Sequence, residues 1–258
     1  MRIIKRLYND FLRPCKIGDY EKVIKKAKEL GYEFHTIRSF EQVIGHKQTG
    51  KKYLILRRDV DTKDIKILRK MLEVEKKYGA RCSYYFRLST FDIQLMQDIE
   101  KFGGEASYHF EEIASFCYEH KKIDLGFVNT HMNLIRQNFI DNYKEMKALT
   151  GLRMDTVASH GDFINVKLGI RNNYLIDERV RKDTGIIREA YDREHEGELD
   201  CNIFDLGEKD FAQEIIEVLE SGAQTVEWLT HPRQWNSPFW VNLKEEISRV
   251  FRGIYMNI

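Results

Sequence analysis

Apolar residues recur along this chain with two periods that alternate. Short runs of apolar and aromatic residues are typical of buried strands, and apolar positions spaced three and four apart are typical of amphipathic helices. Residues 19–30 show the helical spacing, with Asp19 as a candidate N-cap and Gly31 as a candidate stop. The pattern predicts strands at 32–37, 53–57, 82–86, 105–108, 156–159 and 225–230. It predicts helices at 19–30, 39–46, 62–80 and 92–104, and one continuous or broken helix at about 121–149.

The repeated order of strand then helix predicts a parallel sheet covered by helices. For a chain of 258 residues, a distorted α/β barrel of about seven or eight strand–helix units is favoured over an open sheet. We therefore expect a single domain over 1–258, with the elements of 1–50 packed on the barrel. Residues 170–210 are polar, and we expect irregular or inserted structure there.

The charge balance and the cysteines narrow the class of protein. Lysine and arginine number 42 against 41 aspartates and glutamates, a net charge of +1 that argues against a nucleic-acid binder and an electrostatic membrane anchor. The four cysteines form no C-x-x-C pair, which favours a reducing compartment. Apolar runs long enough for a secretory signal or a membrane span are missing from the sequence. We expect a cytoplasmic protein and make no prediction of its oligomeric state.

Ionisable side chains follow five of the predicted strands. In parallel α/β folds, functional groups gather at the carboxyl ends of strands, so these side chains are expected at one rim. A mixed set of carboxylates and imidazoles suits a divalent transition metal such as zinc, and the remaining groups could serve as a base and an acid. The candidates are Arg58, Asp59 and Asp61; Arg87; His109, Glu111 and Glu112; His160 and Asp162; and His231, Arg233 and Trp235.

Each candidate also has a structural interpretation. A single histidine at a strand end is more often a hydrogen-bonded structural residue than a ligand. Asp59 or Asp61 could cap the helix that begins near Thr62. Glu111 and Glu112 could form an exposed first helical turn, which the helix dipole favours. Only the convergence of several such groups favours a functional site.

Five segments together resemble one protein family. They are "LILRRDVD" at 54–61, "ARCSYYFRL" at 80–88, "FGGEASYHFEEI" at 102–113, "VASHGD" at 157–162 and "WLTHPRQW" at 228–235. In this order they resemble the polysaccharide deacetylase superfamily, with the NodB-homology or carbohydrate esterase family 4 fold. More narrowly, they resemble its cytosolic branch with D-V-D and H-P-x-x-W motifs. The resemblance covers roughly residues 18–240 and implies a distorted (β/α) barrel.

The resemblance also implies roles for individual residues. Asp59 matches the catalytic base and Asp61 the metal-binding aspartate, although the two could be exchanged. His109 matches the first histidine of an H-x-x-x-H metal motif, and His231 matches the general acid. The second histidine of that motif would fall on Ile113, so this chain lacks it. We expect His160 to replace it, with Glu112 as the other candidate.

The implied activity is metal-dependent removal of an acyl group from an N-acylated amino sugar. The substrate would be a small or a nucleotide- or lipid-linked sugar, such as a precursor of O-antigen or capsule polysaccharide. Arg58 or Arg87 is expected to keep Asp59 ionised, and Trp235 and Tyr108 could stack on a sugar face or pack in the core. Alternatives are an amide or ureide hydrolase on the same barrel, and a non-catalytic sugar-binding member.

Overall fold

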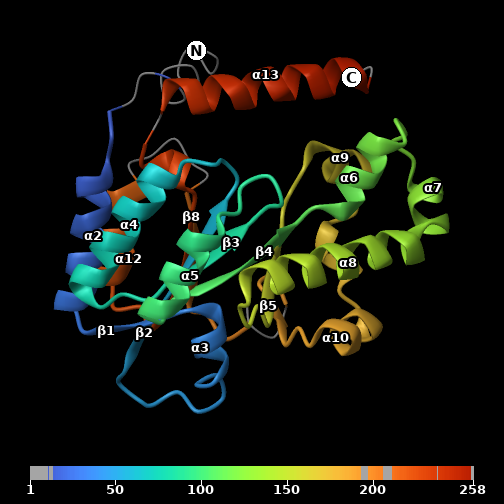
Figure 1. The fold of residues 1–258 in the computed structure, drawn as a ribbon. Helices are drawn as coiled ribbons and strands as arrows, with labels where there is room; N and C mark the ends of the chain where they lie inside the picture. The colour runs from blue at the N-terminus through green and yellow to red at the C-terminus, as the bar shows by residue number, and fades with distance from the viewer. Residues whose placement is uncertain (1–10, 12–13, 193–196, 206–210, 237, 257–258) are drawn as a thin grey trace.

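A computed structural model describes residues 11, 14–192, 197–205, 211–236 and 238–256. Its centre is a curved sheet of parallel strands surrounded by helices, as predicted (Figure 1). The strands are β1 (Tyr32–His35), β2 (Lys52–Val60), β3 (Ser83–Phe86), β4 (Glu105–Phe110), β5 (Thr156–Ser159), β6 (Arg188–Glu189), β7 (Cys201–Phe204) and β8 (Thr225–Thr230). Within the described ranges, no helix has the length and apolar character needed to cross a membrane.

The strand order is β6-β5-β4-β3-β2-β8-β7, and β2 is the longest strand. One side of β2 pairs with β8, and the other is shared by two strands. Its first half pairs with β1 and its second half with β3. β6 and β7 end the path of described strands, so the sheet forms an open, distorted barrel.

Helices cover the outside of the sheet and cross its carboxyl end. α2, α4 and α12 lie together on one side, and α13 runs across the end of the molecule above β4 and α6 (Figure 1). The helices are α2 (Ile17–Glu29), α3 (Ile37–Glu41), α4 (Ile65–Tyr78), α5 (Ile93–Phe102), α6 (Glu112–Glu119), α7 (Leu125–Thr130), α8 (Met132–Thr150), α9 (Phe163–Leu168), α10 (Glu178–Thr184), α12 (Phe211–Glu220) and α13 (Phe239–Tyr255), with 3-10 turns η1 (Asn172–Leu175) and η2 (Pro232–Gln234).

Local chemistry sets the helix ends. The Asp64 carboxylate accepts a hydrogen bond from the backbone N–H of Ile67 and so starts α4, and Gly79, with a φ of 70°, ends it. The cap of this helix is therefore Asp64, and neither Asp59 nor Asp61 has that role. α2 begins earlier than predicted, after Lys16, which leaves Asp19 in its first turn.

One prediction of secondary structure is corrected, and one that left two alternatives open is decided. The segment 170–210 contributes β6 and β7 to the sheet as well as α10 and η1, so it is not merely irregular, although 193–196 and 206–210 lie outside the described residues. The helix expected at 121–149 is divided at His131 into α7 and α8. The division into domains stays a prediction.

Alternation along β2 assigns its side chains to two cores. Leu54 and Leu56 belong to the large core between the sheet and the helices. Tyr53 and Ile55 belong to a small core inside the barrel, with Tyr85 of β3. Because successive side chains of a strand point to opposite faces, Arg57 and Asp59 continue the inner series and Arg58 continues the outer one.

Candidate metal and acid–base site

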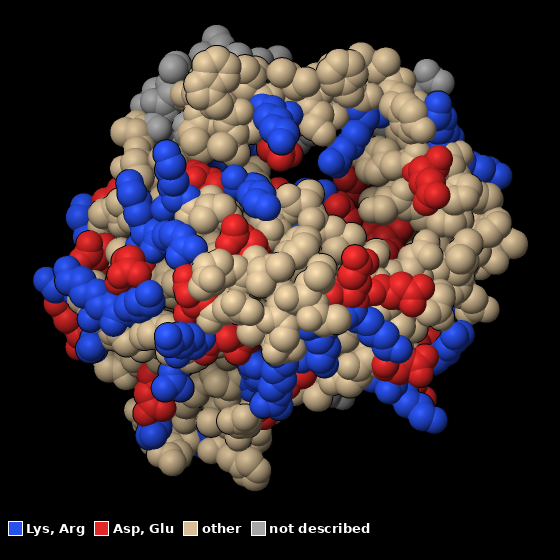
Figure 2. Space-filling model, viewed as in Figure 1, with Lys and Arg blue, Asp and Glu red and all other residues tan. Residues whose placement is uncertain are grey.

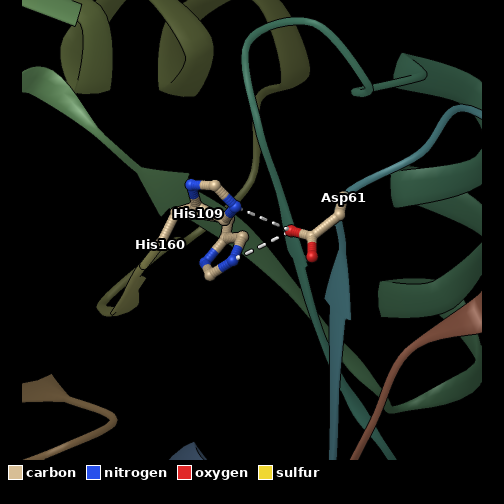
Figure 3. A group of neighbouring side chains, drawn as sticks. All are labelled: Asp61, His109 and His160. Carbon is tan, nitrogen blue, oxygen red and sulfur yellow. Dashed lines mark ion pairs between the residues drawn. The ribbon is translucent and has the colours of Figure 1, made fainter. Parts of the chain in front are cut away.

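Three side chains from different strand ends meet at the carboxyl end of the barrel. Asp61 follows β2, His109 lies in β4, and His160 follows β5. Asp61 Oδ1 lies 3.3 Å from Nε2 of His109 and 3.5 Å from Nε2 of His160 (Figure 3). One ligand-type atom from each residue lies within 4.8 Å of the other two. The predicted convergence of these residues is therefore present.

The orientation of this cluster suits a cation. Nδ1 of His109 lies 3.0 Å from the carbonyl oxygen of Ala158, which can only accept, so Nδ1 is the donor and Nε2 is the ring atom that faces Asp61. Asp61 Oδ1 is shielded from solvent and has no hydrogen-bond partner among the described residues. An unpartnered carboxylate oxygen facing imidazole nitrogens fits the donor set of a divalent transition metal.

A buried ion pair lies directly beneath the cluster. Arg57 donates through Nε and Nη2 to the two carboxylate oxygens of Asp59, at 3.0 and 2.8 Å. Asp59 Oδ2 also lies 3.7 Å from Nε2 of His109. Burial opposes ionisation of Asp59, but the charge and hydrogen bonds of Arg57, together with His109 and His231, outweigh it and lower the pKa of the carboxyl group. Asp59 is thus held as a carboxylate at the edge of the cluster.

The prediction that Arg58 or Arg87 pairs with Asp59 is wrong. Arg58 points to the outer face of β2, where its Nη1 lies 2.6 Å from Glu75 of α4. Arg87 forms a bidentate pair with Glu111. The partner of Asp59 is Arg57, which shares its face of the strand because the two residues are two positions apart.

Next to the cluster, His231 forms a pair with Asp205, which follows β7. The distance from His231 Nδ1 to Asp205 Oδ1 is 2.7 Å, and the backbone N–H of His231 donates to the other oxygen. Burial lowers the pKa of His231, but the charge and hydrogen bond of Asp205, together with the charges of Asp61 and Asp59, outweigh it and raise the pKa to about 10. The Nε2 atom lies 3.7 Å from Asp61 Oδ2, so the imidazolium faces the cluster.

Glu111 supports His160 from behind. Its Oε2 lies 3.2 Å from Nδ1 of His160, and its carboxylate is held by Arg87 at 2.6 Å. Burial opposes ionisation of Glu111, but contacts with His160 and Arg87 lower its pKa to about 2. A carboxylate behind a ring nitrogen fixes the orientation of the ring and leaves Nε2 directed at the cluster.

Glu112 does not reach this site. Its carboxylate accepts from Tyr108 Oη at 2.5 Å and from Asn142 at 3.1 Å, in the core between β4 and α8. Burial raises its pKa to about 7. Glu112 is therefore excluded as the replacement for the missing histidine. Ile113, where that histidine would lie, is completely buried.

The remaining candidates have local roles. Trp235 is 1% exposed and donates from Nε1 to Thr230 Oγ1, so it packs in the core, as does Tyr108. Arg233 contacts Glu246 of α13. Asp162 caps α9 by accepting from the N–H of Ile164.

A cleft of about 800 Å³ opens above the cluster, within the size range of small-ligand sites. Asp59, Asp61, His109, His160 and His231 all line it. Apolar side chains form part of its wall, and polar side chains from α9 and η1 form another part. The residues of these walls are Tyr191, Phe204 and Leu229, and Asp162, Asn165, Arg171 and Asn172.

Comparison with known proteins gives little more. Neither a protein-family model nor a curated protein matches the sequence. Among solved structures, the Streptococcus pyogenes deacetylase PplD in complex with acetate matches with a TM-score of 0.41 and 12% sequence identity, over 59% of this chain and 68% of that one.

Proposed function

We propose that this chain is a metal-dependent hydrolase that removes the acyl group of an N-acylated amino sugar. The observation that carries the proposal is the placement of two pairs of ionisable groups next to one three-donor cluster. Arg57–Asp59 supplies a carboxylate, and Asp205–His231 supplies an imidazolium. Hydrolysis of an amide needs both, because one proton must leave the attacking water and another must reach the departing amine.

The residues proposed to hold the metal are Asp61, His109 and His160. One oxygen and two nitrogen ligands match the three-ligand sets of catalytic zinc sites, so zinc is the proposed ion. A bound ion would polarise the acyl carbonyl and lower the pKa of a water molecule. Glu111 would keep the ring of His160 in place during turnover.

The two pairs have complementary roles. Asp59 accepts the proton of the attacking water, and Arg57 keeps Asp59 ionised before each attack. His231 donates its Nε2 proton to the departing amine, because Asp205 stabilises the imidazolium that faces the cluster. Both groups line the cleft, so a substrate placed there can contact both of them.

We propose an amino sugar as substrate because the cleft combines an apolar wall with amide and guanidinium groups. Tyr191 and Leu229 could cover the apolar face of a sugar ring, while Arg171 could bind hydroxyl groups. Asp162, Arg233 and Arg87 support the loops around the cleft. A nucleotide- or lipid-linked precursor of O-antigen or capsule polysaccharide is the proposed biological form of this sugar.

Metal content and acetate release test the proposal together. The purified chain should retain about one zinc ion per molecule by elemental analysis, and Asp61→Asn should lose it. Asp98→Asn, which changes an exposed carboxylate paired with Arg69, is the matched control and should retain the metal. Acetate release from a panel of N-acetylated amino sugars should follow the metal content. A folded wild-type chain that binds no divalent metal, or a fully loaded chain that releases no acyl group, contradicts the proposal.

A further inference from the structure

A second cavity, of about 620 Å³, lies between α13 and α6. It corresponds to the hollow beneath the upper layer of the molecule in Figure 2, where Figure 1 places α13. Its volume is in the range of small-ligand sites. It is lined by Glu111, Ser115 and Tyr118 on one side and by Ser248, Phe251, Arg252, Ile254 and Tyr255 of α13 on the other.

The apolar side chains of α13 are unusually open to solvent. Seven large apolar residues of this helix are between 47% and 77% exposed, whereas a helix on a globular domain normally buries such a face against the core. Phe251 and Ile254 are two-thirds exposed even though they line the cavity. The seven residues are Phe239, Trp240, Ile247, Val250, Phe251, Ile254 and Tyr255.

Two cations lie beside this apolar surface. The guanidinium of Arg252 lies 5.6 Å from the ring centroid of Tyr118, and Nζ of Lys121 lies 4.0 Å from that of Tyr255. In the part of the chain that the structure describes, no carboxylate pairs with either cation. The one acidic residue of the lining, Glu111, is already neutralised by Arg87. The cavity therefore has an apolar wall next to positive charge that is available to an anion.

The cavity also lies next to the candidate metal site. Glu111 lines the cavity and contacts His160, whose other ring nitrogen faces Asp61. A ligand in the cavity is thus separated from the metal cluster by a single layer of side chains. An extended substrate could occupy the cleft and the cavity together.

We propose that the cavity beneath α13 binds an amphiphile in which a hydrocarbon chain adjoins an anionic group such as phosphate. The apolar side chains of α13 would cover the chain, and Arg252 and Lys121 would bind the anion. Resting on the proposed function, this inference assigns the substrate to the class of acylated amino sugars carried on a hydrocarbon chain through phosphate. The exposed face of α13 and the unpaired cations then have one common explanation.

Calorimetric titration with simple probes tests the cavity without requiring turnover. The probes are inorganic phosphate, hexyl phosphate, decyl phosphate and the uncharged decyl maltoside, each below its critical micelle concentration. Decyl phosphate should bind most tightly, with affinity rising roughly fourfold for each added methylene group that is buried. Inorganic phosphate that binds as tightly as decyl phosphate, or affinity that is independent of chain length, overturns the proposal.

Two variants with matched controls locate the site. Arg252→Gln should weaken decyl phosphate binding about tenfold or more, because a charge-assisted contact is lost, while decyl maltoside binding changes little. Phe251→Ser should weaken both decyl probes. The controls are Arg179→Gln in α10 and Leu149→Ser in α8, which change exposed residues that do not line the cavity. Affinities in the two variants that equal those of the controls overturn the proposal.

A membrane or a second copy of the chain bound to the exposed apolar face of α13 would give different results. Flotation with phosphatidylglycerol vesicles that depends on Phe251, without binding of monomeric decyl phosphate, identifies α13 as a membrane contact and overturns the proposal. A dimer in sedimentation analysis that Phe251→Ser dissociates, again without decyl phosphate binding, overturns it in favour of self-association. Asp61→Asn should bind decyl phosphate like wild type. Decyl phosphate binding in a chain that hydrolyses no acylated sugar supports the cavity and contradicts the proposed function.

Discussion

Two pairs of neighbouring identical residues, Arg57–Arg58 and Glu111–Glu112, divide between the inside and the outside of the barrel. Both arginines are 1% exposed, so burial does not distinguish them. Arg57 points inward to Asp59, at the edge of the cleft. Arg58 points outward and lies in a closed network, in which Glu75 accepts from Arg58 and from the hydroxyl groups of Tyr20 and Tyr84.

Glu111 and Glu112 divide in the same way, and their surroundings shift their pKa values in opposite directions. Glu111 faces two cationic partners, which lower its pKa to about 2, whereas Glu112 faces a tyrosine and an amide in the core, and burial raises its pKa to about 7. Residue type and burial are therefore insufficient to assign a role in this fold. The direction of the side chain decides whether a buried charge stabilises the core or supports the site.

Among substitutions that test this comparison, one on the inner face of the barrel should have the largest effect. Asp59→Asn should reduce turnover about 10²- to 10⁴-fold, because the amide has the size of the carboxylate but accepts no proton. Metal content should stay at the wild-type value, measured by elemental analysis beside steady-state kinetics. Loss of metal would instead mean that Asp59 is the ligand and that the two aspartates have exchanged roles.

At the outer face, Arg58→Ala should destabilise the fold by about 3–5 kcal/mol, because it leaves the buried carboxylate of Glu75 without its cation. Urea denaturation measures the free energy of unfolding. Arg69→Ala, which removes an exposed ion pair with Asp98, is the control and should cost less than about 1 kcal/mol. Turnover per folded molecule should be unchanged. A catalytic defect larger than the loss of folded protein would contradict a purely structural role for Arg58.

Glu112 makes stability depend on pH. Its folded-state pKa of about 7 is above the ordinary value of 4.5, so the folded state holds the proton more tightly. The tighter proton binding stabilises the folded state fully below about pH 4.5, and this stabilisation is lost as the pH rises to about 7. Above that pH it does not change further, and the total loss is about 3 kcal/mol. Glu112→Gln should remove this dependence. The measurement is the difference in unfolding free energy between wild type and variant at pH 5 and pH 8, and a constant difference would exclude the effect.

The smallest expected effect concerns the support of His160. Glu111→Gln should weaken zinc binding about 10- to 100-fold, because the charged partner of Nδ1 is lost. Competition with a chelator measures the affinity. Glu112→Gln is the matched control, since it makes the same change one residue away on the outer face, and its zinc affinity should equal that of wild type. Equal weakening in both variants would show a general structural effect instead.

Part of this arrangement could be predicted from the sequence. The rule that functional groups follow parallel strands brought Asp61, His109 and His160 to one rim, because strand ends are visible as the limits of apolar runs. Arg57 was missed because the strand was expected to end there. β2 continues to Val60, and only then does the two-residue alternation place Arg57 beside Asp59.

Asp205 was missed for a different reason. It follows β7, in a polar segment that lacks the apolar run by which strands are recognised. Of the four residues of β7, only Ile203 is buried, so the strand has little of the usual hydrophobic pattern. Its pairing with His231 depends on β7 lying next to β8, a contact set by the sheet and not by local sequence. The divergent roles of Glu111 and Glu112 likewise depend on their partners. Those of Glu111 follow β3 and β5, and those of Glu112 lie in β4 and α8.

Among the described strands, β6 and β7 are the two ends of the sheet and are not paired with each other. This opening has a mechanical consequence. A closed barrel resists widening because every strand is hydrogen-bonded on both sides, but the described strands form a path whose two ends are not joined. His160 is attached to the β5 side of this path and Asp205 to the β8 side. Small changes in curvature would therefore alter the width of the cleft without breaking a ladder. Amide hydrogens of β6 and β7 should exchange faster than those of β2, which lies in the middle of the sheet.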